Sequence, residues 1–135
     1  MDKIQEKYYE MQIINKHIEE LDNNLIQIDE QINEINVVIK ALDDINNIKE
    51  NNEILVPIAN GIFANAKISK NDKLIVNVGQ NTLVEKNIED TKKLISKQLI
   101  QLEKYRELIQ NELNNLSEKA YQIEKDADEM VKKDV

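Results

Sequence analysis

Apolar residues recur at alternating steps of three and four along both ends of this chain, and this spacing restricts the fold more than any other feature. The first repeat runs without a break through Met11, Ile14, Ile18, Leu21, Leu25, Ile28, Ile32, Ile35, Ile39 and Leu42. The second occupies Ile88, Lys92, Ile95, Leu99, Leu102, Arg106, Ile109, Leu113, Leu116, Ala120, Ile123, Ala127 and Met130. A period of about 3.5 residues sustained over many heptads is typical of a coiled-coil seam, so the sequence predicts two long helices.

The two predicted helices have similar lengths and a common period, which favours pairing with each other. A short connection lowers the entropic cost of bringing them together and makes the pair antiparallel. Met11 is then expected near Ile123, and Arg106 near Asp29 or Glu30, where an ion pair can form. In the alternative arrangement, each helix pairs with another chain.

Two charged residues, Lys92 and Arg106, interrupt the second seam. Their long stems can lie along a narrow seam while the charged ends reach water. Such residues fix register or partner choice at some cost in stability. Asn87, just before this repeat, has the side chain of a helix N-cap.

The middle of the chain, residues 53–86, has the short β-branched runs of strands. The strand candidates are Ile54–Ile58, Ile62–Ile68, Lys73–Val78 and Leu83–Lys86. Residues that favour reversals separate them, namely Asn60-Gly61, Asn71-Asp72 and Gly79. Pro57 cannot donate to a ladder, so the first strand is expected to be an edge or to be bulged there. The strands divide into two hairpins.

These hairpins are too small to be stable alone, because a two-stranded ribbon buries little apolar area in water. Their open edges would pair with strands of other subunits in a shared sheet or barrel, so oligomerisation is expected. The candidate assembly residues are Ile54, Val56, Ile58, Ile62, Phe63, Leu74, Val76 and Val78. The predicted α+β fold is a long antiparallel two-helix coiled coil with two central β-hairpins that join a multi-subunit β-barrel.

One domain over residues 1–135 is expected, with an N-terminal helix in 1–50, the hairpins in 53–86 and a C-terminal helix in 87–132. The chain has no Cys, which excludes disulfides and thiolate metal sites. Its net charge of −8 argues against nucleic-acid binding. No apolar run approaches the roughly 20 residues of a membrane span, and the first residues lack the apolar core of a signal peptide. A cytoplasmic protein without membrane or nucleic-acid partners is expected.

Nothing in the sequence favours an enzyme. His17 is the single histidine and has no second His or Cys to complete a metal site. Adjacent carboxylates such as Asp29 and Glu30 do not face each other on a helix. Residues 79–82 lack the second Gly and the Lys-Ser/Thr pair of a phosphate-binding loop. No catalytic residue, cofactor or metal is therefore expected.

The antiparallel pairing would place both ends of the chain together, away from the hairpins. These ends carry more apolar residues than a two-helix seam can bury, namely Ile4, Tyr8, Tyr9, Met11, Met130 and Val131. Adjacent residues cannot both face one seam, and Met suits surfaces that accept varied partners. Two interpretations remain open from these residues, capture of apolar segments or simple packing and fraying of the helix ends.

The middle of the chain resembles the α-type subunit of prefoldin, in its archaeal form. The resemblance is carried by residues 54–58 (ILVPI), Gly61, residues 64–66 (ANA) and residues 74–79 (LIVNVG), set between two heptad repeats. Room for two hairpins is similar to the α class, because β-class subunits carry one.

This resemblance implies a heterohexamer of two α and four β subunits, in which the hairpins form a double β-barrel. It also implies that the ends of the coiled coils hold non-native proteins and pass them to a group II chaperonin without nucleotide. The first functional hypothesis is thus an ATP-independent holdase that binds unfolded proteins through the six end residues. The alternative is a structural coiled-coil scaffold that binds one fixed folded partner.

Overall fold

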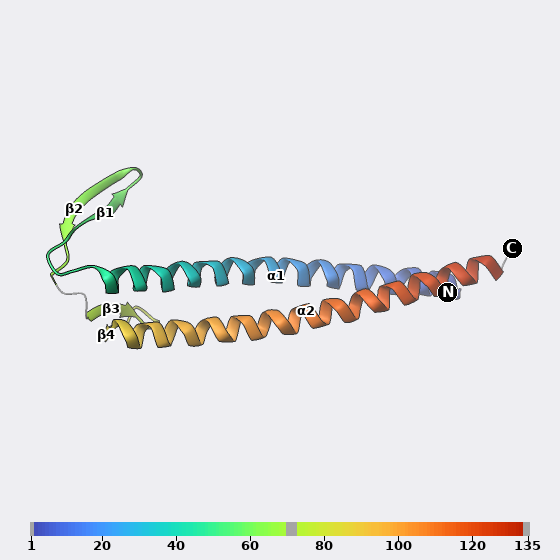
Figure 1. Cartoon of the computed structure of the whole chain (residues 1–135). Coiled ribbons are helices and arrows are strands. Elements are labelled where there is room, and N and C mark those ends of the chain that lie inside the picture. The colour runs from blue at the N-terminus through green and yellow to red at the C-terminus, as the bar shows by residue number, and fades with distance from the viewer. Residues whose placement is uncertain (1, 70–72, 134–135) are drawn as a thin grey trace. The chain divides into compact units, whose positions relative to one another are not determined.

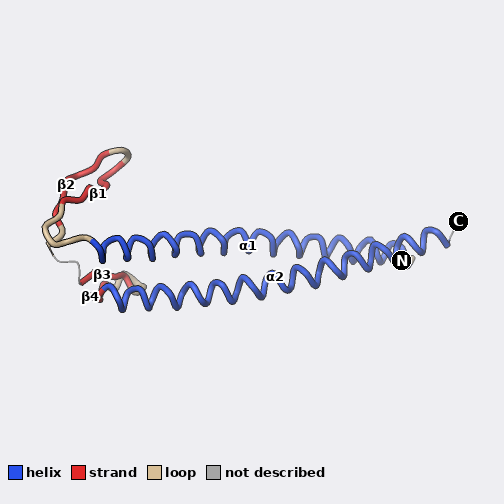
Figure 2. Tube along the Cα trace, viewed as in Figure 1, coloured by secondary structure: helices blue, strands red, loops and turns tan. Residues whose placement is uncertain are grey.

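The computed structural model describes residues 2–69 and 73–133. Its elements are α1 (Lys3–Asn47), β1 (Glu53–Ala59), β2 (Ile62–Lys67), β3 (Lys73–Asn77), β4 (Leu83–Asn87) and α2 (Ile88–Lys133) (Figures 1 and 2). Long helices flanking small antiparallel hairpins confirm the predicted fold class. The predicted reversal at Asn71-Asp72 lies outside the described residues.

The heptad spacing of α1 produces one buried stripe, as predicted. All ten seam residues from Met11 to Leu42 are buried or half-buried, whereas most residues between them are exposed. The helix begins where the Asp2 Oδ1 accepts a hydrogen bond from the backbone N–H of Ile4 at 2.6 Å. It ends at Asn47, close to the Asn-rich segment in which Asn51 adopts a φ of 68°.

The second helix begins at the predicted cap. The side-chain Oδ1 of Asn87 accepts a hydrogen bond from the backbone N–H of Asp90 at 2.7 Å, and the buried Thr91 hydroxyl donates to the Asn87 carbonyl at 2.8 Å. Glu89 and Asp90 lie in the first turn, where their negative charges interact favourably with the positive end of the helix dipole. The cap therefore fixes the junction between β4 and α2.

The chain divides into two compact units, and the first contains residues up to 32 together with those from 101 onward. In this unit α1 and α2 pack antiparallel through a thin core of Leu21, Ile28, Ile109 and Leu113. Half-buried residues extend the core along the seam, namely Ile18, Leu25, Ile32 and Leu116. The packing confirms that the two repeats of one chain pair with each other in this unit.

The second unit, residues 33–100, contains both hairpins. In the first hairpin β1 pairs antiparallel with β2, and the register shifts between Pro57 and Ala59. This irregularity confirms the expected bulge at proline, which has no N–H to donate. At the reversal Gly61 adopts a left-handed φ of 73°, while Asn60 does not, so only the glycine uses the positive φ that this dipeptide permits.

In the second hairpin β3 pairs antiparallel with β4, and Val76 lies opposite Val84. Three consecutive residues turn the chain with positive φ, namely Gly79, Gln80 and Asn81. The backbone N–H of Val78 closes the turn on the Thr82 carbonyl at 3.0 Å. The segment predicted to be a turn rather than a phosphate-binding loop is thus a hairpin turn.

Across residues 2–69 and 73–133, neither helix contains a stretch that is long and apolar enough to cross a lipid bilayer.

Because the core is thin, substitutions at two adjacent residues of α2 should differ in their effect on stability. Ile109 is 4% exposed and Leu108 is 65% exposed. Replacing Ile109 by Ala should lower the free energy of unfolding by about 2–3 kcal/mol, because it removes buried methylenes from the seam. Leu108→Ala is the matched control and should change the free energy of unfolding by less than about 0.5 kcal/mol. Urea unfolding followed by far-UV circular dichroism measures both, and equal losses would contradict the assignment of the seam.

Candidate functional site

Two cross-helix ion pairs follow one rule of spacing. Lys92 of α2 pairs with Asp43 of α1, and the Nε of Arg106 donates to the Oδ1 of Asp29 at 2.6 Å. In each pair the cation comes from a seam position of α2, and both members of the second pair are two heptads from those of the first. The second pair confirms one of the two contacts predicted for Arg106.

The hydrogen bond with Asp29, and then its negative charge, raise the pKa of Arg106 above the ordinary value. A group whose pKa is raised on folding stabilises the folded state fully below its unfolded pKa, and this stabilisation is lost as the pH rises through the folded pKa. Proton release from Arg106 therefore does not change the stability near neutral pH.

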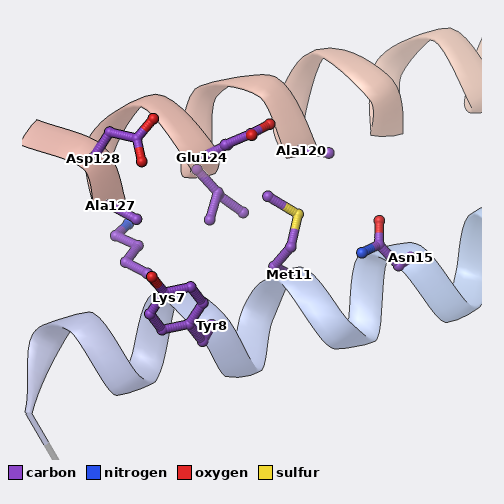
Figure 3. Close-up of a pocket in the computed structure, with 9 residues that line it drawn as sticks. Lys7, Tyr8, Met11, Asn15, Ala120, Glu124, Ala127 and Asp128 are labelled. Carbon is purple, nitrogen blue, oxygen red and sulfur yellow. The ribbon is translucent and has the colours of Figure 1, made fainter.

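Beyond this pair, in the same compact unit, an open groove of about 450 Å³ lies between α1 and α2 (Figure 3). It is lined by Lys7, Tyr8, Met11, Asn15, Ala120, Ile123, Glu124, Ala127 and Asp128, and we call it the helix-end groove. In Figure 3 the side chain of Met11 extends from α1 toward α2, between Tyr8 and Asn15. Met11 and Ile123 thus face the same space, in agreement with the predicted register.

The groove opens where the rule of the ion pairs is broken. A third pair at the same two-heptad spacing would fall at Asn15 and Ala120, but neither residue carries a charge. Ala120 lacks the long side chain that Lys92 and Arg106 extend toward α1, and Ala127 is another short seam residue one heptad further on. Two short side chains in a seam built for larger ones leave unfilled space between the helices.

The lining of the helix-end groove combines apolar side chains with polar and charged ones. Met11 and Ala120 are half-buried, and Ile123 and Ala127 are buried at 7% and 6% exposure. Within the described part of the chain, the carboxylates of Glu124 and Asp128 form no hydrogen bond or ion pair. One cation, Lys7, also lines the groove and extends toward α2 in Figure 3.

Four of the six residues predicted to bind at the helix ends line one of two hollows. Tyr8 and Met11 line the helix-end groove, whereas Ile4 and Met130 line a smaller hollow of about 330 Å³ with Asp2, Lys3 and Lys133. Tyr9 and Val131 line neither hollow and are 58% and 44% exposed. The residues of the groove that were not selected from the sequence are Lys7, Asn15, Ala120, Ile123, Glu124, Ala127 and Asp128. The signal that was present is the pair of alanines one heptad apart in the seam.

The strand registers show on which face of its hairpin each candidate assembly residue lies. Ile54 and Val56 lie opposite the small residues Ala66 and Ala64, on one face of the first hairpin. Ile58 and Ile62, close to the bulge, are 67% and 58% exposed, and Phe63 is 57% exposed on the opposite face. In the second hairpin Leu74 and Val76 are half-buried, and Val78 is exposed.

The hairpins also expose large apolar residues that the sequence-based selection left out. Leu55, Ile75 and Leu83 are 65%, 72% and 64% exposed, and each points to the face opposite the half-buried residues of its strand. Strong alternation of burial along β3 and β4 separates the two faces. Both faces of these small sheets therefore carry large apolar side chains, although the more exposed face also carries charged residues such as Lys73 and Glu85.

His17 is exposed, as expected, and its Nε2 lies 3.5 Å from the Glu112 Oε1 across the helix pair. Three or more His, Asp or Glu side chains do not gather anywhere in residues 2–69 and 73–133 in a way that could hold a metal ion. The acidic residues of the helices are spread along exposed faces.

Comparison with known proteins gives consistent matches to one family. Residues 14–133 match the profile of the family described as "Prefoldin: Prefoldin subunit". "Prefoldin subunit alpha" of Thermofilum pendens is 30% identical over 85% of this chain and 89% of its own length. The protein with the same description from Methanococcus maripaludis is 28% identical, over 83% of this chain and 76% of its own.

A solved structure shares the fold. A chain in the cryo-EM structure of filamentous PFD from Methanocaldococcus jannaschii superposes with a TM-score of 0.74 at 24% sequence identity, covering 84% of this chain and 93% of its own. The family profile covers residues 14–133, and the T. pendens relative matches over 85% of the chain. The chain thus belongs to the prefoldin subunit family, in its alpha class, whose members are components of a chaperone.

Proposed function

We propose that this chain is the α subunit of an ATP-independent holdase that binds unfolded proteins at the ends of its helices. It acts in the cytoplasm as part of a heterohexamer of two α and four β subunits and passes its clients to a group II chaperonin. The chain itself carries no catalytic site. The observation that carries the proposal is the helix-end groove, an open cleft between the two helices whose lining includes the apolar side chains of Met11, Ile123 and Ala127.

The groove has the properties of a site for apolar segments. Its wall combines the flexible side chain of Met11 with the aliphatic surface of Ile123 and Ala127. Methionine adapts its shape to different partners, which suits a site that accepts many sequences. Burying one apolar client side chain here contributes about 1.5–3 kcal/mol, which corresponds to weak binding by a single groove. Several subunits that hold one client together would raise the effective affinity without any new contact.

The hairpins support the proposed assembly. The residues selected from the sequence, together with the exposed Leu55, Ile75 and Leu83, place large apolar side chains on both faces of two-stranded sheets. Small isolated ribbons of this kind are marginal in water, and their unpaired edges favour pairing with strands of other subunits. Partner subunits of the β type would cover these faces and edges, and the hairpins would then build the body of the heterohexamer.

The alternative function is a structural scaffold that binds one fixed folded partner. A scaffold needs a surface complementary to that partner, whereas a holdase needs a site that tolerates different sequences. An open groove with an adaptable Met favours the holdase. Client breadth separates the two functions, because a scaffold would ignore unrelated unfolded proteins.

The series of ion pairs stops at the groove, and a variant that adds the missing pair tests whether clients bind there. Asn15→Asp combined with Ala120→Arg should restore a third cross-helix pair, whose arginine stem fills the groove. The complex with this variant should still assemble. We expect that about tenfold more of it is needed to suppress aggregation of several unrelated denatured proteins without nucleotide. Light scattering during dilution from denaturant measures this protection.

The matched control adds the same two charges at exposed positions outside the groove, as Asn24→Asp combined with Asn111→Arg. It should protect clients as well as the original chain. If the groove-filling variant also protects fully, binding at the groove is wrong. If the original chain retains a single folded partner and no denatured protein, the scaffold is the correct function.

The assembly is tested through the hairpins. Leu55→Lys combined with Ile75→Lys places two charges on exposed apolar faces, where burial in an interface would be strongly unfavourable. We expect the mass of the complex formed with a β-type subunit to fall to that of free subunits, with helical content unchanged. Light scattering coupled to size-exclusion chromatography measures the mass. Gln80→Lys, in the turn between β3 and β4, is the control and should assemble normally. A folded monomer that ignores β-type subunits would contradict the proposed assembly.

A further inference from the structure

We propose that the helix-end groove selects apolar segments that carry a basic residue beside the apolar side chain. This inference rests on the proposed function, because it assumes that the groove holds unfolded chains, and it adds a preference among them. The observation behind it is the charge at the margin of the groove, where carboxylates outnumber the cation.

The two carboxylates are placed to meet the flanks of a bound segment. Glu124 and Asp128 are one helical turn apart on α2, so they lie on the same side of this helix. Both are exposed and both line the groove, next to the buried Ile123 and Ala127. A segment whose apolar side chain enters the groove would therefore carry its neighbouring residues past this acidic margin.

The carboxylates are available for an external cation. In the described residues, neither Glu124 nor Asp128 pairs with a basic side chain, in contrast to Asp29 and Asp43 further along the helix pair. Lys7 offsets part of their charge, because it lines the same groove without an ion pair of its own among the described residues. The lining keeps an excess of one negative charge, which attracts a basic flank and repels an acidic one.

The expected preference is modest, since exposed charges interact weakly in water and are screened by salt. Exchanging a basic flank for an acidic one replaces attraction by repulsion at two carboxylates. A difference of about three- to tenfold in dissociation constant follows at low ionic strength. The apolar part of the binding should be unaffected by this exchange, because it depends on the wall of the groove.

Two fluorescein-labelled peptides with an identical core of Leu, Val and Phe test the inference, one flanked by Lys pairs and the other by Glu pairs. Fluorescence anisotropy with the full chain in its assembled form should show tighter binding of the Lys-flanked peptide. This difference should disappear at high salt. Glu124→Gln combined with Asp128→Asn should remove the preference and keep binding of both peptides, with helical content checked by circular dichroism.

The chain offers a closely matched control. Glu103 and Glu107 occupy the same heptad positions as Glu124 and Asp128, three heptads earlier on α2, and do not line the groove. Glu103→Gln combined with Glu107→Gln changes the net charge by the same amount, so it should keep the preference for Lys flanks. If this control loses the preference equally, the attraction comes from the overall charge of −8 and the inference is wrong.

The remaining outcomes separate this inference from the proposed function. Equal affinity of the original chain for the two peptides, with both lost in the Asn15→Asp, Ala120→Arg variant, would overturn only the charge preference. Failure of both peptides to bind, or full binding to the groove-filling variant, would overturn the groove as a client site and the preference with it. Loss of the preference in the Glu124→Gln, Asp128→Asn variant alone supports the inference.

Discussion

The seam between α1 and α2 is the interaction on which the rest of this structure depends. Two helices can bury only one stripe each, so the core is thin and is confined to residues such as Leu21, Ile28, Ile109 and Leu113. Every other apolar side chain must then be exposed, or be covered by another molecule. A chain with such a thin core has a stable helix pair and, at the same time, a large apolar surface that it cannot cover itself.

Along the seam, the size of the side chains decides where the helix pair is closed and where it is open. Lys92 and Arg106 reach from the seam to carboxylates on α1, while the following position in this series is Ala120. The change from a long charged side chain to a methyl group leaves the helix-end groove. A short side chain at a seam position of a regular repeat thus accompanies a candidate binding site between the helices.

The hairpins show the same dependence on external partners in another form. Their registers separate a half-buried face, which carries Leu74 and Val76, from an exposed one, which carries Ile75 and Leu83. The residues selected from the sequence include Leu74 and Val76 of the first face but neither Ile75 nor Leu83 of the second. Because both faces carry large apolar side chains, alternation alone could not identify the more exposed set.

The sequence by itself determined the two helices, the seam residues, the cap at Asn87 and the hairpin turns, because period and turn chemistry are local properties. For Arg106 it left two partners open, Asp29 and Glu30, and the structure chose Asp29. Only the tertiary structure decided which end residues share a hollow and which faces of the strands remain open. It brought Asn15 of α1 and Ala120 of α2 to the same groove. These features depend on which side chains meet across the helix pair and how much space they leave, and that is set by packing rather than by periodicity.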